Sequence, residues 1–115
     1  MVVFDEEKQD ERVSALLKKE EEELASTLSH RHGVPYLDLS THPINIDALR
    51  VVKEQDARAG EIAVFNATDK KIDVAVLSPE KEKTIEVIED LKRRGYDPEI
   101  FMVSHQSLER VWERY

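Results

Sequence analysis

Four histidines carry the side chains best suited to metal binding or acid–base catalysis: His30, His32, His42 and His105. His30 and His32 are two residues apart, which on a helix points them in different directions, whereas metal-binding pairs on helices use spacings of three or four. The chain has no cysteine, which excludes thiolate zinc sites, disulfides and thiol nucleophiles. It also has no His-Glu-x-x-His pattern. This distribution favours solvent-facing histidines that stabilise a helix end over a metal site.

Carboxylates are abundant in the sequence, but they do not form a recognisable acid–base pair. The glutamate run at positions 20–23 spreads negative charge around nearly a full helical turn, which is typical of a solvated face or a salt-sensitive partner contact. Ser29, Ser40, Ser104 and Ser107 stand at expected helix ends or turns without a nucleophile-elbow pattern, which favours capping over catalysis. A small stand-alone enzyme that uses histidine and carboxylates is therefore the least supported function.

Phosphate-binding loops need clustered glycines followed by lysine and a helix N-terminus, because backbone amides must approach the anion closely. The chain has three glycines, each at an expected helix or strand boundary, and no such cluster. The chain itself is therefore not expected to be a Walker-type ATPase.

A basic cluster, Lys-Arg-Arg at positions 92–94, ends an expected helix. Two interpretations are open: the cations stabilise the negative end of the helix dipole, or they form a docking patch for an acidic partner. Tyr36, Trp112 and Tyr115 are candidate interface anchors, because aromatic residues dominate binding hot spots. The helical spacing of Trp112 and Tyr115 points first to packing on a sheet.

The composition narrows the class of protein further. The chain has 115 residues, of which 40% are hydrophobic and 37% charged, and its formal net charge is −8. A net negative charge argues against wrapping nucleic acid or lying on an anionic membrane. No apolar run approaches the roughly 20 residues needed to span a bilayer, and the start lacks the pattern of a signal peptide, so we expect a soluble cytoplasmic domain. The acidic excess is concentrated in residues 1–24, which carry nine acids and four bases.

The elements that would position these residues follow from hydrophobic spacing and capping signals. We expect a helix over residues 9–32 that ends at Gly33, an extended stretch over 34–40, and a short helix after Asn45 or Asp47. Residues 62–65 and 72–77 read as an antiparallel hairpin. Ser78-Pro79 predicts the start of a helix that runs to about Arg94, with Ile85, Ile88 and Leu91 facing a core. The last elements are a strand over residues 99–103 and a helix capped by Ser104 or Ser107, with Leu108, Val111, Trp112 and Tyr115 on one side.

The predicted order is α-α-β-β-α-β-α, a small α/β (α+β) sandwich with a three-stranded sheet packed by helices. If the third strand pairs parallel to the second, the helix between them must cross over the sheet. Residues 1–23 are expected to form an acidic helical segment, and residues 24–115 the compact domain.

Residues 24–40, LASTLSHRHGVPYLDLS, resemble the N-terminal domain of the type II secretion and type IV pilus assembly ATPases. That domain has a helix that ends in glycine, then a hydrophobic residue, proline, an aromatic residue and a short acidic-apolar motif. Further similar segments follow in order: PINIDAL at 43–49, QDAR at 55–58, VAVLSP at 74–79 and VSHQSLE at 103–109. The sequence departs from the family pattern at Ser78, where aspartate is common, and at Lys53-Glu54, where proline is frequent. The resemblance covers residues 24–115.

The resemblance implies a non-catalytic docking or regulatory domain that links a hexameric cytoplasmic motor to an inner-membrane platform protein. It implies no cofactor, metal or nucleic acid, no direct membrane insertion, and a hexamer only through the motor domain. The expected partner-binding residues are Tyr36, Asp38 and Leu39 in the family motif, and Lys92, Arg93 and Arg94 in the basic cluster. Some relatives carry an upstream subdomain that binds cyclic di-GMP through an Arg-Leu-Gly motif. A cyclic di-GMP-sensing module is the alternative, although the sequence has no such motif.

Overall fold

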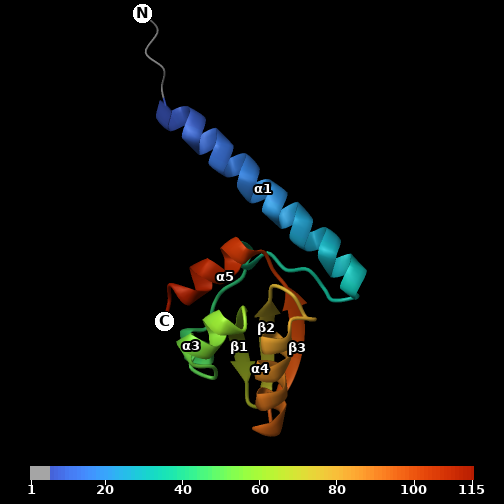
Figure 1. The fold of residues 1–115 in the computed structure, drawn as a ribbon. Helices are drawn as coiled ribbons and strands as arrows, with labels where there is room; N and C mark the ends of the chain where they lie inside the picture. The colour runs from blue at the N-terminus through green and yellow to red at the C-terminus, as the bar shows by residue number, and fades with distance from the viewer. Residues whose placement is uncertain (1–5) are drawn as a thin grey trace, which may run out of the picture.

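The computed structural model describes residues 6–115, with side chains from residue 19 onward. A three-stranded sheet with strand order β1-β2-β3 lies at the centre of the fold (Figure 1). Strands β1 (Ile62–Thr68) and β2 (Lys71–Val76) pair antiparallel, and β3 (Asp97–Met102) pairs parallel to β2. The parallel pairing requires a crossover, which helix α4 (Glu82–Arg93) provides. The predicted hairpin and the mixed α/β fold class are therefore confirmed, and of the pairings left open for the third strand the structure has the parallel one.

The hydrophobic core lies between the sheet and its helices. In register, Ile62 pairs with Val76 and Val64 pairs with Val74, and all four side chains are fully buried. Helix α5 (His105–Trp112) buries Leu108, Val111 and Trp112, and the Trp112 indole Nε1 donates a hydrogen bond of 3.1 Å to the Ile62 carbonyl. The amphipathic spacing of the last helix therefore predicted Leu108, Val111 and Trp112 correctly, whereas Tyr115, expected on the same face, lies beyond α5 and is 38% exposed.

Helix α1 (Glu6–His32) is the long first helix, and its N-terminal half extends away from the sheet (Figure 1). It ends at Gly33, whose φ of +66° lies in the left-handed region that favours glycine. Among the described residues, no helix is long and apolar enough to cross a membrane.

Three short helical elements connect α1 to the sheet: η1 (Leu39–Thr41), α2 (Ile46–Leu49) and α3 (Glu54–Ala59). Of the two predicted caps, Asn45 and Asp47, the structure has Asn45, whose Oδ1 accepts a hydrogen bond of 3.0 Å from the Asp47 amide. Ser104 caps α5 in the same way, since its Oγ accepts from the Ser107 amide at 3.2 Å.

The expected start of the fourth helix at Ser78-Pro79 is wrong. Helix α4 begins at Glu82, after Lys81, which makes no side-chain capping hydrogen bond. Tertiary contacts hold this first turn instead: Thr84 Oγ1 donates to the Gly60 carbonyl at 2.5 Å, and Lys81 forms an ion pair with Glu61. These partners are distant in sequence, so a local capping signal could not locate the boundary.

The inward face of α4 also differs from the prediction at one position. Ile85, expected to face the core, is 44% exposed, whereas Thr84 is fully buried. The buried residues of α4 are Thr84, Val87, Ile88 and Leu91, at spacings of three and four. The hydroxyl of Thr84 takes an inward position because the Gly60 carbonyl satisfies it.

Candidate docking site

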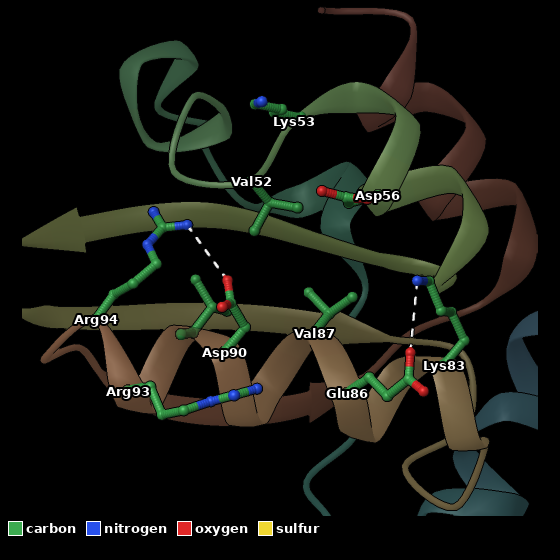
Figure 2. Close-up of a pocket in the computed structure, with 10 residues that line it drawn as sticks. Val52, Lys53, Asp56, Lys83, Glu86, Val87, Asp90, Arg93 and Arg94 are labelled. Atoms are coloured by element: carbon green, nitrogen blue, oxygen red, sulfur yellow. Dashed lines mark ion pairs between the residues drawn. The ribbon is translucent and has the colours of Figure 1, made fainter.

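A groove of about 620 Å³ lies between α3 and α4, and we call it the α3–α4 groove (Figure 2). Its apolar part is formed by Val52, Val87 and Leu91. Charged side chains of both signs surround this part: Lys53, Asp56, Lys83, Glu86, Asp90, Arg93 and Arg94. A small apolar area with a charged surround resembles the anatomy of protein–protein contact surfaces.

Part of this charged surround is paired within the chain. Lys83 Nζ lies 3.5 Å from Glu86 Oε2, and Arg94 Nη1 lies 3.8 Å from Asp90 Oδ2 (Figure 2). Among the ion pairs of the described side chains, none includes Arg93. Arg93 is therefore the cation of the predicted basic cluster that is most available to a partner.

Arg94 has a structural role that the sequence did not reveal. Its Nη2 donates a hydrogen bond of 2.7 Å to the Val51 carbonyl, and its guanidinium lies 5.3 Å from the centre of the Tyr96 ring. The side chain thus ties the end of α4 to the turn after α2. Lys92 does not line the groove, and its Nζ lies 3.8 Å from Glu89 Oε1. The three cations at positions 92–94 therefore divide into three different environments.

The family-motif candidates lie elsewhere, where α1 joins the sheet. The Tyr36 hydroxyl donates a hydrogen bond of 2.6 Å to Glu22 Oε1, and Tyr36 forms an isolated parallel bridge with Met102. Burial, with the hydrogen bond to Glu22, raises the pKa of the Tyr36 phenol well above its usual value. The hydroxyl therefore stays protonated and joins α1 to the segment beside β3.

Asp38 and Leu39 also have contacts within the fold. Asp38 Oδ1 accepts hydrogen bonds from the Ser40 amide at 3.0 Å and the Ser40 hydroxyl at 2.7 Å, so it caps η1. Leu39 is 4% exposed and belongs to the hydrophobic core. Neither residue lines the α3–α4 groove, so the structure separates the two predicted groups of partner-binding residues.

A second groove, of about 580 Å³, lies between residues 39–44 and α5, and we call it the loop–α5 groove. Its lining combines the apolar residues Leu39, Pro43 and Ile44 with Ser40, His42, Ser107, Arg110, Glu113 and Arg114. Arg110 and Arg114 were missed as candidate site residues. Their spacing of four on an expected helix was a usable signal, because such residues share one face. The loop that faces them could not be placed from sequence.

The histidines make local contacts. His30 Nδ1 lies 2.7 Å from the Ser26 carbonyl, His32 Nδ1 lies 3.3 Å from Glu80 Oε1, and His105 Nδ1 lies 3.5 Å from Glu109 Oε1. No group of three histidine or carboxylate side chains suited to a metal ion occurs in the described part of the chain.

The family follows from a comparison that covers most of the chain. A model of the MshEN domain matches residues 32–115, the sheet and every helix after α1. The chain belongs to the MshEN family. This confirms the resemblance to N-terminal domains of type II secretion and type IV pilus ATPases. Both grooves lie within the matched residues of this MshEN domain.

Solved structures share the fold. The structure of MshE with cdg superposes with a TM-score of 0.71 at 23% identity, and covers 80% of this chain and 66% of the MshE chain. The N-terminal domain of XpsE matches in two crystal forms, both with a TM-score of 0.63 at 14% identity. The match to one crystal form covers 83% of this chain and 66% of the XpsE chain. The match to the other covers 99% of this chain and 86% of the XpsE chain. No curated protein matches the sequence. At these identities the structures show a shared fold.

Proposed function

We propose that this MshEN domain is a non-catalytic docking domain of a type II secretion or type IV pilus assembly ATPase. It would link the motor domain to an inner-membrane platform protein, on the cytoplasmic side of the membrane. Family membership supports the class of parent protein. The observation that carries the docking role is the α3–α4 groove, with its apolar centre and the unpaired Arg93 at its edge.

The chemistry of the groove defines the surface that the platform protein would present. Val52, Val87 and Leu91 offer a short apolar contact, which suits one or two apolar side chains of the partner. Arg93 and Lys53, without an ion pair among the described side chains, would attract carboxylates at the edge of that contact. Charges at such an edge mainly raise the association rate and set specificity, so binding should weaken with salt.

A pull-down with the cytoplasmic part of the platform protein tests this role. The double variant Lys92→Glu, Arg93→Glu keeps Arg94 and its hydrogen bond to Val51, so the fold should be retained. We expect binding to weaken about tenfold or more, because the variant reverses the unpaired Arg93 at the groove edge together with the neighbouring Lys92. The matched control is Arg110→Glu, Arg114→Glu, which makes the same charge change in the loop–α5 groove and should bind like wild type. Equal binding by all three proteins would refute docking through the basic cluster.

The absence of intrinsic catalysis is part of the same proposal. If this domain docks the ATPase to its platform, the motor domain of the full ATPase hydrolyses ATP. Purified MshEN domain should therefore release no more phosphate from ATP than a buffer blank. Turnover that survives further purification and follows the domain through a gel-filtration column would contradict this part of the proposal.

A second candidate, cyclic di-GMP sensing, is raised by the MshE structure, which contains cdg. The sequence has no Arg-Leu-Gly tripeptide, so we place this candidate second. Calorimetric titration of the domain with cyclic di-GMP should give no heat of binding. A saturable heat, with a rise in the unfolding temperature at the same ligand concentrations, would reverse the order of the two candidates.

A further inference from the structure

The loop–α5 groove holds positive charges that the chain itself leaves unpaired. Arg110 and Arg114 line it, and neither occurs in any ion pair or hydrogen bond among the described side chains. Arg110 lies on α5 and Arg114 in the turn that follows it, and both side chains are exposed. Glu113 is the one carboxylate among the lining residues, so arginines outnumber acids two to one there.

The groove also has an apolar side that faces these arginines. Leu39, Pro43 and Ile44 supply it from the segment around η1. His42 lies in the same lining, and its Nδ1 lies 3.3 Å from both the Asp38 carbonyl and the Thr41 hydroxyl. The lining favours an occupant with at least two neighbouring carboxylates and an apolar side chain beside them.

One segment of this chain has that chemistry and lies exposed. Glu20, Glu21 and Glu23 on α1 are exposed, and none of them forms an ion pair with a described side chain. Leu24 follows directly and is 59% exposed, the highest value among the exposed large hydrophobic residues. Glu20 and Leu24 are four residues apart and therefore share a helix face, with Glu23 beside them.

We propose that residues 20–24 of α1 from one copy occupy the loop–α5 groove of a second copy. Glu20 and Glu23 would pair with Arg110 and Arg114, and Leu24 would pack on the apolar side formed by Leu39, Pro43 and Ile44. Glu20 and Glu23 are three residues apart on α1 and therefore share one face, so both carboxylates can approach the two arginines together. The segment and the groove are different surfaces of one chain. Their contact therefore gives a closed dimer when reciprocal, or a ring when repeated head to tail. The inference does not depend on the proposed platform docking.

Sedimentation equilibrium of the purified chain over a concentration series tests the proposal, at about 50 mM and about 500 mM salt. We expect reversible self-association at low salt that weakens at high salt. Arg110→Glu, Arg114→Glu should weaken the association constant about tenfold or more, and so should Glu20→Lys, Glu23→Lys. Because all four positions are exposed, far-ultraviolet circular dichroism should show an unchanged fold in both variants.

A charge-swap mixture decides whether these two surfaces meet each other. The two double variants, each carrying one reversed surface, should associate when mixed, because the reversed pair restores attraction between opposite charges. Leu24→Ser should weaken association without changing its salt dependence, and Lys92→Glu, Arg93→Glu should leave it unchanged. A wild-type chain that remains monomeric up to about 1 mM at low salt would overturn the proposal. So would an association that persists unchanged in Arg110→Glu, Arg114→Glu, as in a contact between two α1 helices or with another face.

Discussion

In the α3–α4 groove two of the lining cations have carboxylates nearby, Lys83 at 3.5 Å from Glu86 and Arg94 at 3.8 Å from Asp90. In the loop–α5 groove, neither arginine has such a partner among the described side chains. Two of the four cations that line the first groove are therefore paired within the chain, and Arg93 and Lys53 form no ion pair among the described side chains. The second presents two adjacent charges. The α3–α4 groove thus combines two paired cations with two unpaired ones, whereas both arginines that line the loop–α5 groove are unpaired among the described side chains.

The largest expected loss of unfolding free energy comes from a residue in the apolar part of the α3–α4 groove, and a residue on the outer face of α4 provides the comparison. Leu91 is fully buried, so Leu91→Ala should lower the free energy of unfolding by about 3 kcal/mol through lost burial and a cavity. Ile85 is 44% exposed, and Ile85→Ala should change that free energy by about 0.5 kcal/mol or less. Urea denaturation followed by circular dichroism measures both. Similar losses for the two variants would contradict the observed orientation of α4.

That orientation shows where sequence reasoning succeeded and where it failed. Ile88 and Leu91 were placed correctly because they are apolar at helical spacing. Thr84 was missed because a polar residue is buried when a distant carbonyl, here that of Gly60, accepts its hydrogen bond. The same contact explains the misplaced helix start at Ser78-Pro79. Gly33 was predicted correctly, and Asn45 and Ser104 were each one of two predicted caps, because each cap depends on backbone within a few residues.

The grooves themselves could not be predicted from sequence. Each one joins segments that are distant along the chain, such as α3 with α4, or residues 39–44 with α5. The basic cluster was visible as a charge run, but its division into Lys92, Arg93 and Arg94 depends on the Val51 carbonyl, 43 residues before Arg94. For Tyr36, Asp38 and Leu39 the structure shows contacts within the fold, and a role in partner binding stays a prediction.

The next prediction tests whether Arg94 stabilises the fold while Arg93 is available to a partner. Arg94→Ala should lower the free energy of unfolding by about 1 kcal/mol, because it removes the hydrogen bond to Val51 and the contact with Tyr96. Arg93→Ala should leave it within about 0.5 kcal/mol of wild type, while weakening binding to the platform protein. Urea denaturation and the pull-down together separate the two roles. Equal stability losses would mean that Arg93 is also held by the fold.

A third prediction concerns Tyr115, which connects the end of the chain to the α3–α4 groove. Its hydroxyl donates a hydrogen bond of 2.9 Å to the carbonyl of Val52, a groove residue. Tyr115→Phe should cost about 1 kcal/mol or less at neutral pH. Burial, with the nearby Glu54 carboxylate, raises the pKa of Tyr115 to about 12 from 10.0. The folded state therefore holds this proton longer than the unfolded state, and stability falls as pH rises from 10.0 towards about 12.

Tyr115→Phe should make that alkaline fall shallower, without abolishing it, because Tyr36 also has a raised pKa. Unfolding free energies from urea denaturation at a series of pH values between neutral and about 12 measure the slope. Tyr96→Phe serves as the matched control for removal of a tyrosine hydroxyl. A slope identical to wild type in Tyr115→Phe would show that this hydroxyl contributes nothing to the alkaline loss.

The smallest expected changes in unfolding free energy come from replacing the two arginines of the loop–α5 groove. Arg110→Ala and Arg114→Ala remove side chains without an ion pair or hydrogen bond among the described residues, so each should change the free energy of unfolding by less than about 0.5 kcal/mol. Arg110 lies in the last turn of α5 and Arg114 directly after the helix, where a cation favours the helix dipole. If the dipole were their main role, both variants would lose stability and self-association would be unchanged. If the groove receives a second copy, stability is kept and the association constant falls. Urea denaturation and sedimentation equilibrium on the same two proteins therefore distinguish arginines that stabilise α5 from arginines that bind a second copy of the chain.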